Sequence, residues 1–420
     1  MAEVRPFAAI RPAQGYAKRI AALPYDVFEE GEARREVEKN PLSFLAIDRP
    51  ETIAGDGENR YEKAGELLWK RFREGCLIQD GSPGYYIYEL TAEGRSQTGI
   101  AGLVPVDDYL SGAIHRHENT RAEKEEDRIR HVAGCMAQTG PIFLAYRARE
   151  EIRLLQEAEK ERSPLYDFTA EDGVRHRIWR VWEPERIEAV RAAFQKAGDL
   201  YIADGHHRCA AAVSCALSMR RRHPDFTGEE PWNFILSVLF GDDSLRILDY
   251  NRAVRAPEGM TQRRLLERLA PCFEIEFVGS ETARPRKKGE FGMYVRDGWY
   301  LLTAREELSS PDPVEGLDTA ILQKYVLEPV FGIQNPRTDG RISFVGGARG
   351  AGELERRVEL EGGAAFLLYP TSMQELFAVA DAGRLMPPKS TWFEPKLRSG
   401  LLIYSLKDQE TNDRRVSYYE

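Results

Sequence analysis

The feature that most constrains this chain is a polar box between two apolar runs, within YIADGHHRCAAAVSCAL at residues 201–217. The first run has the composition of a strand, Asp-Gly permits a tight turn, and the alanine-rich run is typical of a helix that packs closely on a sheet. Three arginines at 220–222 suit the negative end of that helix's dipole. The box is therefore predicted to lie between the end of a strand and the start of a helix.

The start of a helix attracts anions, because its first backbone N–H groups are unpaired and its dipole is positive there. The box adds two imidazoles and a guanidinium, which suit contact with phosphate, at Gly205, His206, His207 and Arg208. Asp204, just before the turn, is a candidate ligand for Mg²⁺ shared with the phosphates. The simpler alternative is a helix capped by Asp204, with both histidines on the surface.

A second candidate group is Glu118, which precedes a charged helix predicted over about residues 121–138. It lies beside His115 and His117 on a loop, and loops held by rigid elements are where catalytic groups concentrate. A carboxylate there can serve as a general base. The alternative is an ordinary loop acid.

A third polar stretch, MPPKSTWFEPK at 386–396, is a proline-stiffened loop. Lys389 and Lys396 suit a carboxylate or a phosphate, and Ser390 and Thr391 can hydrogen-bond the same group. The alternative is an exposed turn without a ligand.

Helical and strand-like runs alternate along the chain and predict a mixed α/β protein, α+β in character. Two hairpins are expected, one from the runs at 84–90 and 99–106 and one from those at 233–240 and 245–254, around the turn GDDS. A later helix is predicted with Thr371 as its N-cap.

Composition narrows the class of protein. The 420 residues are 42% hydrophobic and 30% charged with a net charge of −9, which disfavours binding of nucleic acid. No run approaches the length of a membrane span, and the first twenty residues lack a signal-peptide core, so a cytoplasmic protein is expected. Five cysteines without a C-x-x-C pair indicate reduced thiols.

Taken in chain order, three stretches resemble the active-site stretches of free-serine kinases with a ParB/sulfiredoxin-like fold. They are HE at 117–118, DGHHR at 204–208, and PKST with a later lysine at 388–396. PYDV at 24–27 and HENTRAEKEEDR at 117–128 also resemble a bacterial and archaeal family long catalogued as a domain of unknown function. The N-terminal hundred residues have no counterpart in the compact serine kinases.

The resemblance implies transfer of a phosphoryl group from ADP or ATP to the hydroxyl of free L-serine, giving O-phospho-L-serine. Glu118 would match the base that takes the hydroxyl proton, and Asp204 the acid near Mg²⁺. Residues 205–208 would match the phosphate-binding turn. The loop at 389–391 and Lys396 would match the segment that closes over serine.

We further predict that His117, beside the base, and Asn251 and Arg252, at the end of the second hairpin, help to bind serine. The expected regions are an N-terminal α/β region at 1–110, a ParB/sulfiredoxin-like catalytic core at 111–255 and a C-terminal α/β region at 256–420 that completes the substrate site. A small-molecule partner is expected, with neither nucleic acid nor membrane.

Two alternatives remain open. The first is a ParB-like nucleotide-binding switch without kinase activity, although no helix-turn-helix is evident. The second is a His/Asp metallohydrolase, whose ligands would be drawn from His115, His117, Asp204, His206 and His207. No specific ligand spacing accompanies that second set.

Overall fold

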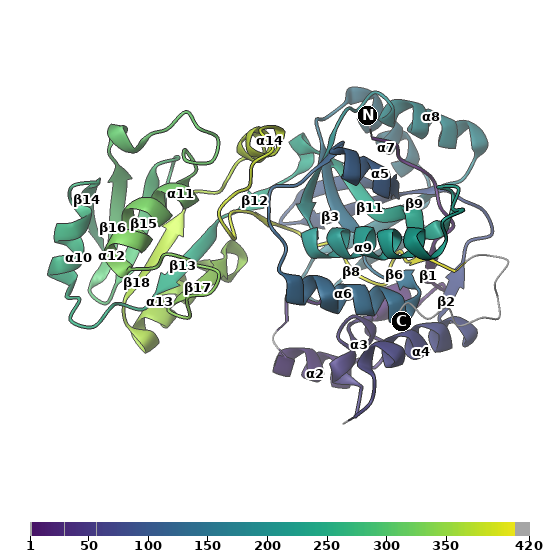
Figure 1. Ribbon diagram of the computed structural model, residues 1–420, viewed down its shortest axis with the longest axis horizontal. Coiled ribbons are helices and arrows are strands. Elements are labelled where there is room, and N and C mark those ends of the chain that lie inside the picture. Colours follow the sequence, from purple (N-terminus) through teal and green to yellow (C-terminus); the bar gives the residue numbers. More distant parts are fainter. Residues whose placement is uncertain (1, 29, 56, 408–420) are drawn as a thin grey trace. The chain divides into compact units, whose positions relative to one another are not determined.

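The computed structural model describes residues 2–28, 30–55 and 57–407, which form two compact units (Figure 1). Unit 1 comprises the described parts of Met1–His115, Thr120–Leu245 and Pro395–Glu420. Unit 2 comprises Arg116–Asn119 and Arg246–Glu394. Helices and strands occur in both units, so the prediction of a mixed α/β protein is confirmed.

Unit 1 contains the strand and the helix that flank the polar box. Its elements are β1 (Ile10–Pro12), α1 (Ala17–Ile20), α2 (Glu30–Lys39), α3 (Leu45–Asp48), α4 (Arg60–Arg73), β2 (Leu77–Gln79), β3 (Tyr85–Ala92), β4 (Arg95–Pro105), α5 (Val106–Ser111), β5 (Ile114–His115), α6 (Ala122–Cys135), β6 (Ala137–Gln138), β7 (Ile142–Tyr146), α7 (Glu150–Lys160), β8 (Tyr166–Thr169), β9 (Arg175–Val181), α8 (Pro184–Phe194), β10 (Leu200–Asp204), α9 (His206–Arg222), β11 (Phe234–Gly241) and β20 (Tyr404–Ser405).

The helices and strands of unit 2 lie in its longer segment, Arg246–Glu394. Its elements are β12 (Ile247–Leu248), β13 (Tyr250–Val254), α10 (Gln262–Leu269), β14 (Phe273–Gly279), β15 (Glu290–Val295), β16 (Gly298–Ala304), α11 (Asp318–Leu322), α12 (Glu328–Phe331), β17 (Ile342–Gly346), α13 (Gly350–Glu361), β18 (Ala364–Leu368), α14 (Met373–Asp381) and β19 (Trp392–Phe393). A π-helical turn, Gln323–Leu327, joins α11 to α12.

The chain is divided differently from the predicted regions 1–110, 111–255 and 256–420. Strands β3 and β4 of the N-terminal region pair with β9 and β11 of the predicted core in one sheet. These backbone hydrogen bonds join the first two predicted regions into unit 1. The segment after residue 394 also returns to unit 1.

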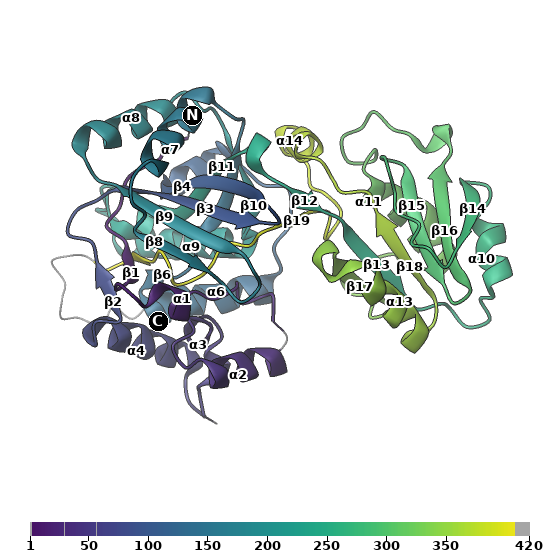
Figure 2. The same cartoon turned by 180° about the vertical axis from the view of Figure 1, so that it is seen from behind.

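The main sheet of unit 1 has eight strands in the order β5-β10-β7-β11-β4-β3-β9-β8. Strand β10, which leads to the polar box, is parallel to β5 and antiparallel to β7. Helix α9 lies in front of this sheet in Figure 1 and behind it in Figure 2. Its small residues Cys209, Ala212 and Ala216 are buried in the same core as strand residues Ile202 and Leu239. The alanine-rich run therefore lets α9 pack closely on the sheet, as predicted.

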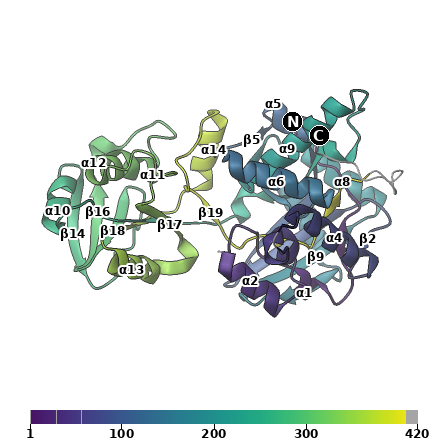
Figure 3. The ribbon, with the colours of Figure 1, turned by 60° about the horizontal axis from the view of Figure 1, so that its bottom comes forward.

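Three helices of unit 1 pack in the order α4, α6, α9, as Figure 3 shows. A Cβ at Gly65 of α4 would lie 2.1 Å from the carbonyl oxygen of Gly134 in α6. A Cβ at Gly134 would in turn lie 2.4 Å from the carbonyl oxygen of Tyr61. Because both atoms are backbone oxygens that cannot rotate away, the two glycines are required for this close crossing.

The six-stranded sheet of unit 2 has the order β14-β16-β15-β18-β13-β17. Successive residues of strand β18 point to opposite faces of the sheet, and the residues on each face are buried in a different hydrophobic core. Ala364, Phe366 and Leu368 belong to the core that contains residues of α10, α11 and α12. Ala365 and Leu367 belong to the core formed with α13. Helices therefore cover both faces of this sheet.

One predicted hairpin is confirmed and the other is wrong. β3 pairs with β4 in antiparallel fashion, as the runs at 84–90 and 99–106 predicted. β11, in contrast, pairs with β4 and β7, whereas β12 and β13 belong to unit 2. The GDDS turn begins a 3₁₀ helix, Asp242–Ser244, after which the chain leaves unit 1.

All five cysteines are free thiols, in agreement with the sequence. Cys209, in the first turns of α9, is buried, and burial raises the pKa of its thiol to about 12. It therefore packs inward as an unreactive core residue. Among the helices that the structure describes, none combines the length and apolarity needed to cross a bilayer.

Candidate active site

The polar box forms the turn that the sequence predicts. β10 ends at Asp204, Gly205 has a φ of 92°, and α9 begins at His206. Glycine adopts this left-handed conformation readily, and a Cβ at Gly205 would lie 3.0 Å from Nη2 of Arg208. The N–H of Gly205 donates to Oδ1 of Asp204 at 2.8 Å. The glycine thus lets the Arg208 guanidinium lie against the backbone at the start of α9.

Asp204 also contacts a lysine that is 192 residues away in the sequence. Nζ of Lys396 donates to Oδ2 of Asp204 at 3.1 Å. Burial alone would raise the pKa of Asp204, but the charges of Lys396 and Arg208 outweigh burial and hold that pKa well below its usual range. The carboxylate is therefore ionised at neutral pH, with 31% of the side chain exposed. Two predicted site residues are thus brought together within unit 1.

The guanidinium of Arg208 keeps most of its hydrogen-bonding capacity. Nη1 donates to the carbonyl oxygen of Pro141 at 2.7 Å. Within the described parts of the chain, this is its one hydrogen bond, and it forms no ion pair there. Because a guanidinium has five N–H donors, the remaining ones are available to an anion near the start of α9.

The two histidines of the box differ in their surroundings. His206 is buried in the first turn of α9. Nε2 of His207 accepts the backbone N–H of Arg121 at 3.1 Å. A ring nitrogen that accepts a hydrogen bond carries no proton, so this contact assigns the proton of neutral His207 to Nδ1. His207 therefore links α9 to the residue before α6, a contact that the sequence did not predict.

The other two predicted stretches meet in unit 2. The N–H of Met386 donates to the carbonyl oxygen of His117 at 2.8 Å. Nε2 of His117 lies 3.4 Å from Oγ1 of Thr391, 274 residues further along the chain. Buried Ser390 donates through Oγ to the carbonyl oxygen of Pro387 at 2.7 Å. The HE stretch and the PKST loop are therefore neighbours, as a shared site requires.

The buried side chain of Arg252 binds the backbone of this loop. Its Nη2 donates to the carbonyl oxygens of Pro388 and Lys389 at 3.2 and 2.9 Å. Burial lowers the pKa of Arg252 to about 10. Lys389 has a φ of 61°, and its Nζ lies 5.5 Å from the ring centre of Tyr250. Arg252 thus helps to hold the loop in place, and its predicted contact with serine stays a prediction.

Asn251 is fully buried, and both ends of its amide already bind protein atoms. Oδ1 accepts the N–H of Leu368 at 3.0 Å, and Nδ2 donates to Oδ2 of Asp249. This amide joins β13 to the end of β18. The Asn251 amide is thus engaged within unit 2, and its predicted contact with serine stays a prediction.

Glu118, the predicted base, lies in a bend within the segment Arg116–Asn119. Its side chain is half-buried. Within the described residues, its carboxylate has neither a hydrogen bond nor an ion pair, and it is available to accept a proton. Glu118 belongs to unit 2, whereas Asp204 belongs to unit 1.

A small pocket, open to solvent, adjoins Arg208 in unit 1. Its other lining residues are Tyr25, Asp48, Arg128, His131, Val132, Gln138, Thr139, Gly140, Ile142 and Ser399. Sequence reasoning did not single out any of these residues as ligand-binding. Two stretches that contributed to the family resemblance pointed to them: PYDV contains Tyr25, and HENTRAEKEEDR ends at Arg128.

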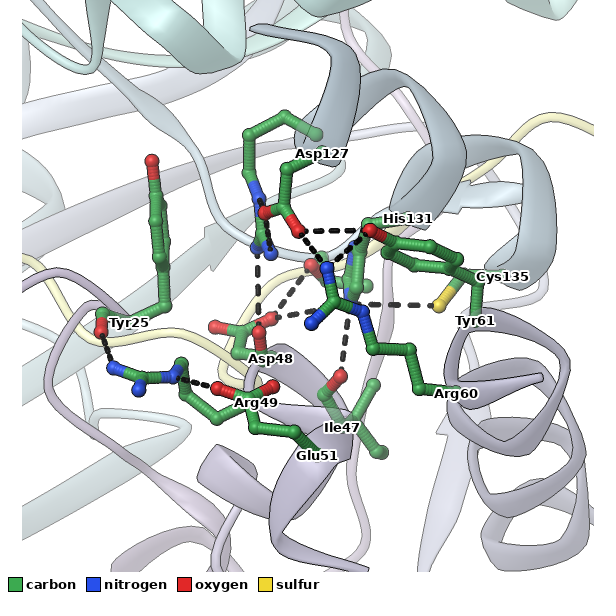
Figure 4. A network of polar contacts seen from close by, with 12 residues as sticks. Tyr25, Ile47, Asp48, Arg49, Glu51, Arg60, Tyr61, Asp127, His131 and Cys135 are labelled. Atoms are coloured by element: carbon green, nitrogen blue, oxygen red, sulfur yellow. Dashed lines mark hydrogen bonds and ion pairs between the residues drawn. The ribbon is translucent and has the colours of Figure 1, made fainter. Parts of the chain in front are cut away.

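A network of polar contacts forms one wall of this pocket (Figure 4). The guanidinium of Arg128 lies 4.0 Å from the ring centre of Tyr25 and makes two hydrogen bonds to Oδ2 of Asp127. Oδ1 of Asp48 accepts the hydroxyl hydrogen of Thr139 at 2.9 Å. Burial lowers the pKa of His131 to about 4, so this imidazole is neutral at physiological pH.

No three His, Cys, Asp or Glu side chains gather as a metal site in the chain as far as the structure describes it. Nε2 of His115 instead lies 3.0 Å from Oδ2 of Asp199. Mg²⁺ needs less, because it is commonly held by one or two carboxylates together with phosphate oxygens and water. The ionised and partly exposed Asp204 fits that requirement.

Comparison with known proteins gives the family. The family model described as "Protein of unknown function (DUF1015)" matches residues 4–320. The chain belongs to this family. The matched range contains Tyr25, Glu118 and the polar box, whereas Lys396 and Ser399 lie beyond it. No curated protein matches the chain.

Several solved structures are similar to the chain at low identity. A free serine kinase variant in complex with ADP has 15% identity and a TM-score of 0.34, and the match covers 69% of this chain and 86% of that one. SbnI with a C-terminal truncation, from Staphylococcus aureus, has 14% identity and a TM-score of 0.40, with 74% and 90% covered. A conserved hypothetical protein from Pyrococcus furiosus has 14% identity and a TM-score of 0.33, with 70% and 92% covered.

Proposed function

We propose that this protein is a nucleotide-dependent kinase that phosphorylates free L-serine, with ADP or ATP as the donor. The observation that carries the proposal is the turn at the start of α9. There an Arg208 guanidinium with spare donors and the N–H groups of a helix start adjoin an ionised Asp204 in contact with Lys396. Phosphoryl transfer depends mainly on positioning and charge stabilisation, which this arrangement supplies.

The reaction needs an anion site, a charge-neutralising group and a base. In the proposed step, the serine hydroxyl oxygen bonds to the terminal phosphorus of the nucleotide, and the bond from that phosphorus to the leaving nucleotide oxygen breaks. ADP would leave AMP, and ATP would leave ADP. Glu118 accepts the hydroxyl proton, and Arg208 and Lys396 stabilise the phosphate charge. Mg²⁺, held by Asp204, would shield charge between the phosphates.

The loop of residues 388–391 is proposed to hold serine. His117 lies against Thr391, which places the residue before the base beside that loop in unit 2. Thr391 and Lys389 supply a hydroxyl and an ammonium group, which suit serine's carboxylate. Ser390 supports the loop through its bond to Pro387. Arg252 keeps its place as a positioning residue.

The test is product analysis by ³¹P NMR after incubation with Mg²⁺, L-serine and either ADP or ATP. We expect a new O-phosphoserine signal with at least one donor, together with the matching AMP or ADP. The same mixture without L-serine is the control for nucleotide hydrolysis. Nucleotide binding without O-phosphoserine from either donor would contradict the proposal and favour the nucleotide-binding switch.

A further inference from the structure

The pocket beside Arg208 is lined by two hydroxyl-bearing side chains to which the proposed reaction assigns no role. Tyr25 and Ser399 are only 8% and 3% exposed, and both line the pocket. Among the residues that the structure describes, neither hydroxyl has a hydrogen-bonding partner. In Figure 4, no dashed line reaches the Tyr25 hydroxyl. Neither oxygen is among the fully buried unpartnered atoms of the described residues, so both hydroxyls are accessible from the pocket and can bond a ligand group there.

The groups with spare capacity are donors. Burial raises the pKa of Tyr25 well above its usual range, and the opposing charges of Arg128 and Arg208 do not cancel this effect. Its hydroxyl therefore keeps its proton at neutral pH. Oγ of Ser399 and Nη1 of Arg208 both lie close to Gly140. A Cβ placed at Gly140 would be 3.0 Å from the first atom and 3.1 Å from the second.

The acid in the pocket is already engaged. Oδ1 of Asp48 accepts the hydroxyl hydrogen of Thr139, and the Asp48 side chain is only 5% exposed. Arg128 is paired with Asp127, and His131 is neutral at physiological pH. Among the pocket's basic groups, the one without an ion-pair partner in the described chain is therefore Arg208, which lines the pocket together with two hydroxyl donors. This arrangement matches an oxyanion rather than a cation or an apolar group.

We propose that Tyr25, Ser399 and Arg208 form an oxyanion subsite that binds a phosphate or carboxylate group of the ligand. The assignment of that group to the nucleotide or to serine rests on the proposed function. The subsite itself rests on unit 1 alone. It gives the N-terminal region a role in ligand recognition, because Tyr25 comes from the loop before α2.

The test uses Tyr25→Phe and Ser399→Ala in the full chain, since each removes a hydroxyl and leaves the surrounding packing. Calorimetric titrations would use inorganic phosphate, ADP with Mg²⁺, and L-serine as separate probes. Each variant is expected to weaken at least one probe about ten-fold, as loss of a hydrogen bond to a charged group predicts. Tyr294→Phe is the matched control, because that hydroxyl bonds Glu359 in unit 2, and it should change no affinity.

The pattern of loss identifies the ligand group. Weaker binding of phosphate and ADP assigns the subsite to the nucleotide, and weaker binding of L-serine assigns it to the serine carboxylate. Unchanged affinities in both folded variants, or no binding of any probe by the unmodified protein, would overturn the subsite. These affinities are measured without turnover. Weakened binding without O-phosphoserine formation would therefore retain the subsite and reject the kinase. Unchanged affinities together with O-phosphoserine formation would reject the subsite and retain the kinase.

Discussion

At the residue scale, Asp204 is the group on which most contacts of the candidate site converge. It accepts the N–H of Gly205, contacts Lys396 and is influenced by the charge of Arg208. If Asp204 holds Mg²⁺, the metal ion would compete with Lys396 for the same carboxylate. The lysine can then interact with the phosphate instead, so that charge remains balanced when the nucleotide binds.

Replacement of Asp204 by Asn separates a metal-binding role from a capping role. The Asn side-chain oxygen can still accept the N–H of Gly205, so the turn should persist. We expect the KM for Mg²⁺-nucleotide to rise roughly ten-fold or more, because a charged contact is lost. Steady-state kinetics at varied Mg²⁺ measure this change. A variant with normal KM and only a lower melting temperature would show that Asp204 merely caps α9.

Replacement of Glu118 by Gln tests the predicted base. Loss of a general base should lower kcat by about 10²–10⁴-fold, whereas nucleotide affinity should stay within about two-fold. Glu123→Gln, an exposed acid in the first turn of α6, is the matched control and should retain full activity. Near-normal kcat in Glu118→Gln would remove Glu118 from the mechanism.

At the element scale, the close packing of α4 against α6 determines the position of the α6 side chains that line the pocket. Arg128 and His131 of α6 line the pocket. Helix α4 packs against α6, and α3 packs against α4. The glycine pair at this crossing keeps the helices closer than any Cβ would allow. A change in helix spacing would therefore displace the pocket residues together.

Gly134→Ala should destabilise unit 1 although alanine favours helices. The new Cβ would meet the Tyr61 carbonyl oxygen at 2.4 Å, and overpacking of this kind costs about 1–3 kcal/mol beyond the helix-propensity gain of roughly 1 kcal/mol. Gly352→Ala in α13 is the control, since a Cβ there meets nothing within 4 Å. Chemical denaturation should show a loss for the first and no loss for the second. Equal stability of both variants would contradict the close crossing.

Sequence signals for helix ends were right about the elements and less accurate about the caps. The predicted helix at 121–138 is α6, which spans Ala122–Cys135, and its N-cap Arg121 makes no side-chain cap bond. The helix predicted with Thr371 as N-cap begins one residue later. Ser372 caps α14 in a capping box with Glu375. Neighbouring hydroxyl residues compete for the cap, and backbone conformation decides between them.

At the scale of the whole molecule, the two units carry buried groups with opposite dependence on pH. In unit 1, burial lowers the pKa of His131 from 6.5 to about 4. In unit 2, burial raises the pKa of Asp318 from 3.8 to about 7. The unfolded chain binds more protons at His131, and the folded chain binds more at Asp318.

The stability of each unit should therefore change with pH in opposite directions. The contribution of His131 is present above pH 6.5 and is lost as the pH falls toward 4, by roughly 3 kcal/mol. The contribution of Asp318 is present below pH 3.8 and is lost as the pH rises toward 7, by roughly 4 kcal/mol. Hydrogen exchange of each unit at pH 4–7 measures this. His131→Gln and Asp318→Asn should each flatten the profile of their own unit, and unchanged profiles would contradict these pKa directions.

Much of the local structure could be predicted from the sequence. The turn at Gly205, the alanine face of α9 and the β3–β4 hairpin depend on neighbouring residues, whose patterns are visible in the chain. The pairing of the strands around GDDS could not be predicted, because a turn sequence does not reveal that the next strand joins another sheet. Pairing across sheets is a long-range choice that local propensity does not contain.

By itself, the sequence determined the mixed α/β class, the family and the strand–turn–helix form of the box at 204–208, because residue types and their order along the chain carry these signals. Only the tertiary structure decided that Lys396 reaches Asp204, that the N-terminal strands share the sheet of the core, and that Tyr25 and Ser399 line one pocket with Arg208. These contacts join segments separated by many residues. They are settled by the packing of whole sheets and helices, which leaves no periodic signal in any one segment.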